Sequence, residues 1–174
     1  MGTVGRNSNL FVDEKLFANQ IIQWFIDRCA REKPQAKIFP NTYIGNWECD
    51  IIELTKSGYL YEYEVKISRA DFKSDAKKET KFYSKANQKK FEVLQSGQRV
   101  NYFYYVVPRH LISVDEVPEF AGLIYVDTTY VNPYFKVIKQ APKLSKEKIT
   151  TDKMLKLLDS VYYRFHQYRR AVIR

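Results

Sequence analysis

Acidic and basic side chains alternate with apolar ones over residues 47–68, W-E-C-D-I-I-E-L-T-K-S-G-Y-L-Y-E-Y-E-V-K-I-S. A period of two is typical of β-strands, and a three-residue loop over residues 56–58 would place Gly58 where a left-handed residue is needed. Counting back from this loop sets Asp50 directly across from Glu64, with Lys66 two residues further along the same face. The pattern therefore predicts a β-hairpin that gathers two carboxylates and a lysine in one place.

Five ionisable residues share this face of the predicted hairpin: Glu48, which lies across from Lys66, Asp50, Glu62, Glu64 and Lys66 itself. A charge left dry and unpaired is costly, so the face must see water, pair internally or hold a metal. A face that is simply solvated explains the alternation just as well. Carboxylate oxygens on adjacent strands are also the ligands that Mg²⁺ prefers. A lysine beside them could orient the attacking water or stabilise charge on a phosphate.

Several other chemistries lack their required residues. The sequence contains no GxxxxGK phosphate loop, no GxGxxG, no HExxH and no GxSxG. His110 and His166 are single and far apart, which leaves a Ser-His or Cys-His mechanism little to work with. Cys29 and Cys49 have no CxxC spacing, so we interpret them as reduced core thiols rather than as zinc ligands or a disulfide.

The charge balance favours a polyanionic partner. Lys and Arg number 29 against 20 Asp and Glu, a net charge of +9, and nucleic acid is the first candidate for such a partner, with an anionic membrane second. No apolar run approaches the length of a membrane span, and residues 1–9 lack the hydrophobic region of a signal peptide. We therefore expect a cytoplasmic protein with no membrane partner.

The first elements should position the hairpin. Apolar residues at three- and four-residue spacing predict a helix that Asp13 caps and that runs to about Arg31. Glu14 falls in its first turn, along the buried stripe. It is either an acid that favours the helix dipole or a companion of the hairpin carboxylates. Residues 37–44, interrupted by Pro40, predict an irregular edge strand.

A second helix is predicted after the hairpin. Ser68 to Asp71 fits a capping box, and we expect the helix to break or bend somewhere before it ends at Gly97. One face of this helix would carry a stripe of lysines at four-residue intervals: Lys73, Lys77, Lys81, Lys85 and Lys89. Such a stripe is usually a solvated face, but stacked like charges would also be relieved by a phosphate backbone.

The remaining elements complete one α/β domain over residues 1–174, with residues 1–10 as a flexible tail. Residues 102–107 predict a buried strand that a parallel crossover joins to the hairpin, and residues 122–127 and 134–139 predict two more. A C-terminal helix within residues 150–174, capped by Thr150 or Thr151, has one apolar face and a basic end. The apolar face comprises Met154, Leu158, Val161, Tyr162 and Phe165, and the basic end Arg164, Arg169, Arg170 and Arg174.

This arrangement resembles a known nuclease superfamily. Asp50, then Glu64-Val65-Lys66 after thirteen residues, on consecutive strands between two helices, is similar to the PD-(D/E)XK signature. The resemblance implies a restriction-endonuclease-like αβββαβ core, here with extra C-terminal strands and a helix. Cys49 stands where a proline often precedes the aspartate. Over somewhat more than half of the chain the sequence is most similar to the MmcB-type DNA-repair group, through the runs E-V-K-I-S-R-A-D-F-K-S-D, Y-F-Y-Y-V-V-P and V-P-E-F-A-G-L-I-Y-V-D.

The resemblance also implies roles for individual residues. Asp50 and Glu64 would bind Mg²⁺ or Mn²⁺ together with the backbone carbonyl of Val65, and Lys66 would position the attacking water. Glu14 would match the first-helix glutamate that many members aim at the metal. Ser68, Asp71 and Asp75 match the run of the closer group, but the capping box already explains Ser68 and Asp71.

We therefore expect a metal-dependent nuclease that hydrolyses phosphodiester bonds in DNA, in repair, recombination, or restriction and phage-related processing. Basic residues of the second and C-terminal helices would hold the DNA backbone. A nucleic-acid-binding module on the same fold, with weak or no catalysis, is the alternative, and a structural protein with solvated charges is a third. The sequence leaves the substrate form and the oligomeric state open, a homodimer included.

Overall fold

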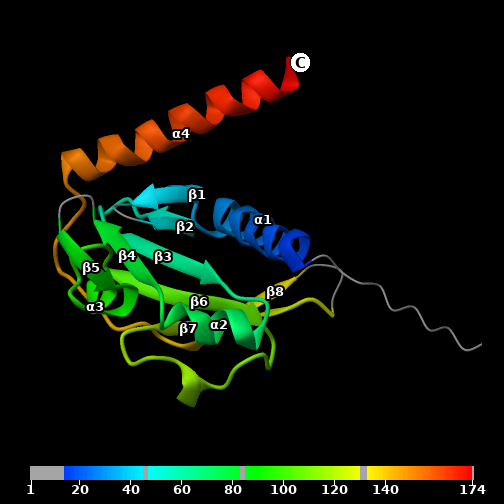
Figure 1. Cartoon of the computed structure of the whole chain (residues 1–174). Helices are drawn as coiled ribbons and strands as arrows, with labels where there is room; N and C mark the ends of the chain where they lie inside the picture. The colour runs from blue at the N-terminus through cyan, green and yellow to red at the C-terminus, as the bar shows by residue number, and fades with distance from the viewer. Residues whose placement is uncertain (1–13, 45–46, 83–84, 130–132, 174) are drawn as a thin grey trace, which may run out of the picture.

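The computed structural model describes residues 14–44, 47–82, 85–129 and 133–173, without the side chains of residues 14–16 and 80–87. Six strands form one mixed sheet in the order β1-β2-β3-β6-β7-β8, with helices on its two faces (Figure 1). Strands β3, β6 and β7 are parallel, whereas β1, β2 and β3 are antiparallel neighbours and β8 is antiparallel to β7. The predicted α/β fold, a mixed sheet flanked by helices, is confirmed at this level.

The elements follow the order predicted from the sequence except in one segment. They are α1 (Glu14–Glu32), β1 (Lys37–Ile44), β2 (Trp47–Leu54), β3 (Leu60–Val65), α2 (Arg69–Asp75), β4 (Glu79–Phe82), β5 (Lys85–Lys89), α3 (Lys90–Gln95), β6 (Tyr102–Pro108), a 3₁₀ turn (Val114–Glu116), β7 (Gly122–Asp127), β8 (Tyr134–Lys139) and α4 (Thr151–Val172). The predicted cap Asp13 and the predicted tail, residues 1–10, lie outside the described residues.

Each face of the sheet has its own hydrophobic core. On one face α1 buries Ile21, Ile22 and Phe25 against alternate residues of β2, β3, β6 and β7. On the other face, Phe72 of α2 and Leu94 of α3 pack with the residues of the opposite parity. The period-two pattern of β3 thus serves both cores, and the ionisable residues lie on the side of α2 and α3.

The hairpin register predicted from the turn is confirmed. Pairs from Ile51–Tyr63 to Leu54–Leu60 share the predicted offset, Thr55 N donates to Tyr59 O at 3.0 Å, and Gly58 has φ +87°. This register needs the left-handed conformation that glycine adopts without steric cost. Asp50 and Glu64 therefore lie one step beyond the last pair, at the end of the ladder.

The predicted second helix breaks after Asp75, one of the two alternatives, but the prediction that the rest of the segment to Gly97 is helical is wrong. Ser68 caps α2 as predicted, accepting a hydrogen bond from Asp71 N, but the helix ends at Asp75, and β4 and β5 form an antiparallel hairpin before the short α3. In this arrangement Lys90 Nζ lies 3.0 Å from Asp75 Oδ1. In a continuous helix, fifteen residues would separate them by roughly 22 Å. A buried carboxylate needs a cationic partner, and the hairpin brings that partner back to it.

The predicted lysine stripe disappears with that helix. Lys73 lies on α2, Lys77 in the turn after it, Lys81 on β4, and Lys85 and Lys89 on β5. Lys73, Lys77 and Lys89 are exposed. The four-residue spacing therefore does not place these lysines on one helix face.

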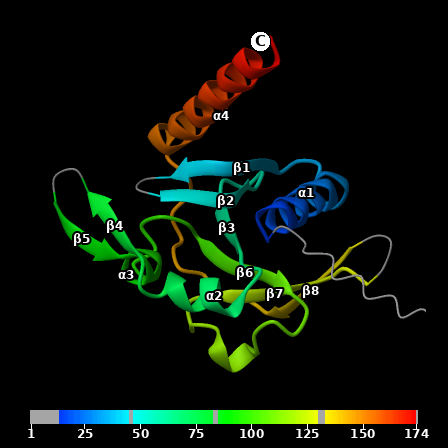
Figure 2. The ribbon, with the colours of Figure 1, turned by 45° about the vertical axis from the view of Figure 1, so that its right-hand side comes forward.

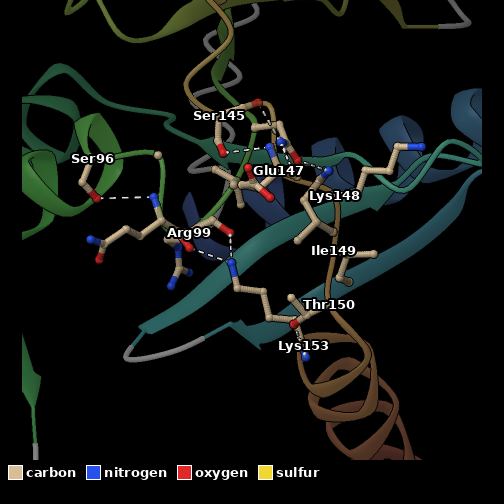
Figure 3. Close-up of a pocket in the computed structure, with 13 residues that line it drawn as sticks. Ser96, Arg99, Ser145, Glu147, Lys148, Ile149, Thr150 and Lys153 are labelled. Atoms are coloured by element: carbon tan, nitrogen blue, oxygen red, sulfur yellow. Dashed lines mark hydrogen bonds between the residues drawn. The ribbon is translucent and has the colours of Figure 1, made fainter.

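The C-terminal helix is confirmed as α4, with Thr150 as its cap. Lys153 in its first turn donates to the carbonyls of Gln98 and Arg99 at 2.6 and 3.4 Å, and Figure 3 shows this side chain reaching from the helix to the loop before β6. These bonds fix where α4 begins. Among the residues that the structure describes, no helix has the length and apolarity that crossing a bilayer requires.

Candidate active site

Asp50 lies where β2 separates from β3. Its Oδ2 accepts a hydrogen bond from the backbone N–H of Val65 at 2.7 Å. In a continued antiparallel ladder that N–H would bond a backbone carbonyl of β2, so the side chain replaces the strand as the acceptor. The register places the Asp50 carboxylate beside the end of β3, next to Glu64.

Glu64 points into a cluster of lysines and is almost fully buried. Its Oε1 lies 3.0 Å from Lys66 Nζ, 3.2 Å from Lys90 Nζ and 3.8 Å from Lys78 Nζ. Its Oε2 is also buried, and among the described residues it has no hydrogen-bond partner. Buried carboxylate oxygens are normally satisfied, so this atom can accept a further ligand.

Asp75 at the end of α2 completes the cluster from the other side. Its Oδ1 lies 3.0 Å from both Lys78 Nζ and Lys90 Nζ and 3.4 Å from Lys66 Nζ, and its Oδ2 accepts a hydrogen bond from the Tyr105 hydroxyl at 2.9 Å. Burial alone would raise the pKa of Asp75, but Lys90, Lys66 and Lys78 outweigh it and lower that pKa to about 2. Asp75 is therefore ionised at every pH at which the protein would work.

Lys66 keeps its charge although it is buried. Desolvation alone would lower its pKa, but the carboxylates of Glu64 and Asp75 raise it above the ordinary lysine value. The pKa of Lys90 is raised for the same reason. An ammonium group held in this way cannot act as a general base, so the role open to Lys66 is that of a fixed positive charge and hydrogen-bond donor.

The pKa of Asp50 is shifted in the opposite direction from that of Asp75. Burial and the nearby Glu64 carboxylate raise it to about 7, although the Val65 N–H, Lys66 and Lys90 partly offset them. When Asp50 is ionised, Glu64 repels its negative charge, and the nearby donors and lysines compensate that charge only in part. A cation placed between the two carboxylates would relieve this repulsion.

The donor set fits one divalent cation. Asp50, the free Oε2 of Glu64 and the Val65 carbonyl are hard oxygen ligands, and Mg²⁺ commonly takes one or two carboxylates and keeps several waters. No group of three or more His, Cys, Asp or Glu side chains with metal-binding geometry occurs among the described residues. A metal here would therefore rest on two carboxylates and on water. The side chain of the third candidate, Glu14, lies outside the described set, although its backbone begins α1.

Two acids of the predicted face belong elsewhere. Glu48 is exposed and pairs with Arg164 of α4. Glu62 is fully buried, where its carboxylate accepts hydrogen bonds from Trp47 Nε1 at 2.9 Å and Arg99 Nε at 2.7 Å. The predicted pairing of Glu48 with Lys66 does not form, because the strands have already separated at Asp50. Both acids have structural partners and no place in the site.

Sequence reasoning did not assign Asp75, Lys78 and Lys90 to the site. A signal for Asp75 was present, because it is the one member of the run S-x-x-D-F-x-x-D that the capping box does not explain. Lys90 had no comparable signal, since its position depends on the β4–β5 hairpin. The cluster reaches solvent at Asp50, Asp71 and Lys78, which are partly exposed, and this side is the one open to a substrate.

A cavity of about 390 Å³ lies elsewhere in the molecule. It is lined by the loop before β6 and by the connector to α4, including Ser96, Arg99, Ser145 and Lys148 (Figure 3). Neither Asp50 nor Glu64 nor Lys66 borders it. The cavity lies between the connector and the loop, and it is separate from the carboxylate site.

Asp75→Asn should destabilise the protein by about 3 kcal/mol near neutral pH, because it removes one of the two buried carboxylates that compensate the charges of Lys66 and Lys90. The pKa of Asp75 is lowered on folding, so its contribution to stability is present above the unfolded pKa near 4 and is lost as the pH falls toward 2. Urea unfolding at several pH values should therefore show the difference between the wild type and Asp75→Asn shrinking below pH 4. A difference that is independent of pH would contradict this account.

Comparison with known proteins shows the fold alone. A protein of unknown function from Silicibacter pomeroyi is similar in structure, with a TM-score of 0.56 and 19% sequence identity over 88% of each chain. No protein-family model matches this chain, and no curated protein sequence matches it.

Proposed function

We propose that this protein hydrolyses phosphodiester bonds in DNA with Mg²⁺ or Mn²⁺. The observation that carries the proposal is the unpartnered, buried Oε2 of Glu64 beside a second carboxylate and a charged lysine. The free oxygen and the raised pKa of Asp50 both favour a cation between the two acids. The positive charge of Lys66 would then stabilise the negative charge that develops on the phosphate in the transition state.

The order of the elements supports the same proposal. One helix, three antiparallel strands and the helix α2 follow one another, and β6, which is parallel to β3, comes after an intervening β4–β5 hairpin and α3. With that hairpin as an insertion, the order is compatible with the αβββαβ core of the PD-(D/E)XK superfamily. Asp50 and Glu64 lie on the second and third strands, where that superfamily carries its acids. The resemblance to the MmcB-type DNA-repair group makes DNA repair the setting that we propose.

Each residue has a definite task in this mechanism. Asp50 and Glu64, with the Val65 carbonyl, would hold the metal, and a metal held there would supply Lewis-acid activation of water and neutralise charge on the scissile phosphate. Lys66 holds a positive charge toward the reacting phosphate and donates hydrogen bonds to the attacking water. Asp75 and Lys90 act through Lys66 and Glu64: their ion pairs fix both side chains in place.

DNA would approach the side of the cluster that Asp50 and Lys78 open to solvent. The exposed lysines Lys73 of α2, Lys77 in the turn after it and Lys89 of β5 are close in sequence to Asp75, Lys78 and Lys90 of the cluster. Charges of this kind contact phosphates without reading sequence. They position the backbone over the site but do not specify a sequence.

The test is a cleavage assay on plasmid and single-stranded DNA, with Mg²⁺ or Mn²⁺ and with EDTA. The purified wild type should cut only with metal, and Glu64→Gln, which keeps the size of the side chain, should cut at least about 100-fold more slowly. Saturating Mn²⁺, at about 100 times its Kd, should stabilise the wild type by about 2.7 kcal/mol and raise Tm by roughly 5–10 °C. Glu64→Gln should lose this shift.

Glu119→Gln is the matched control, since Glu119 is exposed and lies outside the cluster. It should retain both the cutting and the Mn²⁺ shift. Cutting that is undiminished in Glu64→Gln would contradict the proposal. DNA binding without cutting on any substrate, with a log–log salt slope of about 0.9 per phosphate contact on duplex DNA, would instead support the binding module.

A further inference from the structure

The sequence of α4 carries a heptad repeat. Apolar residues alternate at spacings of four and three from Met154 to Val172 and occupy successive d and a positions: Met154, Leu158, Val161, Phe165, Tyr168 and Val172. A repeat of this kind, kept over about three heptads, is the pattern by which one helix packs along another in a coiled coil. We call these six residues the α4 seam.

Most of the α4 seam is uncovered by the rest of the chain, whereas Met154 at its start packs partly against the core. Leu157 is fully buried in the core and Arg164 pairs with Glu48, so this side of the helix contacts the body of the protein. Five seam residues, all but Met154, are between 43% and 68% exposed. In Figures 1 and 2, α4 is an outer element that starts next to β1, and its C-terminal end extends away from the sheet.

An exposed apolar stripe of this length indicates a partner surface. We propose that the α4 seam pairs with the α4 seam of a second copy, antiparallel, to form a homodimer. In antiparallel pairing the a residues of one helix meet the d residues of the other, and the seam matches itself in three layers: Met154 with Val172, Leu158 with Tyr168, and Val161 with Phe165. The twofold axis repeats each layer, which gives a closed, isologous interface.

The charges on α4 favour this direction of pairing. Both acids of the helix, Asp152 and Asp159, lie in its first half together with Lys153 and Lys156, so that half has no net charge, whereas Arg164, Arg169 and Arg170 make the second half basic. A parallel pair would place arginines of one copy against arginines of the other. An antiparallel pair places each basic end beside the neutral half of its partner instead and sets the helix dipoles in opposite directions. This inference does not depend on the proposed hydrolysis.

The test is the mass of the full chain in solution over a wide range of concentrations, by light scattering coupled to gel filtration and by sedimentation. The expected result is a reversible dimer of twice the 20.7 kDa of one chain. Phe165→Glu should weaken dimerisation at least about 100-fold. The substitution occurs in both copies of a symmetric dimer, so it buries two unpaired carboxylates in the interface. Since Phe165 is exposed in the single chain, the Tm of monomeric Phe165→Glu should stay close to the Tm of the monomeric wild type.

Tyr163→Glu is the matched control, because Tyr163 is exposed on the same helix but lies outside the seam. It should dimerise like the wild type. Mixing Leu158→Cys with Tyr168→Cys under oxidising conditions should give a disulfide between the two variants and little within either alone. Cys29 and Cys49 are buried and do not compete.

Three results would overturn the proposal. One is a protein that stays monomeric at every concentration. If DNA binding by that monomer depended on Phe165, the seam would be a nucleic-acid-binding surface instead. Another is a dimer of unchanged affinity in Phe165→Glu, which would place the interface elsewhere. The third is efficient disulfide formation by Leu158→Cys alone, which would show a parallel pair.

Discussion

Lys66→Met is expected to lower the rate of metal-dependent DNA cleavage by about 100- to 1,000-fold, the usual cost of removing one fixed donor from a developing negative charge. Methionine keeps much of the length of the side chain and removes the charge and the hydrogen-bond donors of the ammonium group. Because Asp50 and Glu64 hold the metal in the proposed mechanism, Lys66→Met should still show the Mn²⁺-induced rise in Tm. Loss of cutting with retention of the shift would separate the role of Lys66 from that of the metal ligands.

Lys78→Met is the control for this prediction. Lys78 contacts the same acids as Lys66, but its side chain is 47% exposed, whereas that of Lys66 is 3% exposed. An exposed ammonium group is well solvated and contributes little to such a pair, so Lys78→Met should cut within a few-fold of the wild type. Equal losses in the two variants, or undiminished cutting in Lys66→Met, would contradict the assigned role.

The sequence was sufficient to predict the geometry of the hairpin. Alternation fixed which residues of β3 share a face, and the loop that ends at Gly58 fixed the register. Both signals are local, because a turn of defined length and a period of two determine which residues lie opposite each other. The juxtaposition of Asp50 and Glu64 followed from them without any tertiary information.

The sequence was not sufficient for the cluster around these acids. The contacts of Asp75 with Lys90 join residues fifteen positions apart through a hairpin, and lysines at four-residue spacing suggested a helix over the same segment. Periodicity reports only on local geometry, while the need to pair a buried charge is satisfied across the chain. The same limit applies to α4, where the pattern predicted an apolar face correctly but did not show that this chain leaves it uncovered.

Arg99→Met is expected to cost about 3–5 kcal/mol of folding free energy, because it leaves the Glu62 carboxylate buried with one neutral donor. Arg99 donates to Glu62 Oε2 and Cys49 Sγ, each at 2.7 Å, as well as to the carbonyl of Ile44. Its guanidinium also stacks 3.4 Å from the centre of the Trp47 ring. This one side chain joins the ends of β1 and β2 to β3, and urea unfolding measures its contribution.

The matched variants identify the cause of that cost. Arg69→Met removes an ion pair with Glu116 in which the arginine side chain is 52% exposed, and it should cost less than about 1 kcal/mol. If the uncompensated charge of Glu62 is the main penalty, the double variant Arg99→Met/Glu62→Gln should recover part of the loss, a coupling that a double-mutant cycle detects. Additive losses would attribute the effect to packing against Trp47 instead. In either case the role of Glu62 is structural, because its hydrogen bonds to Trp47 and Arg99 help to hold β2 beside β3. Glu62 therefore lies on the same face as Glu64 without taking part in the proposed reaction.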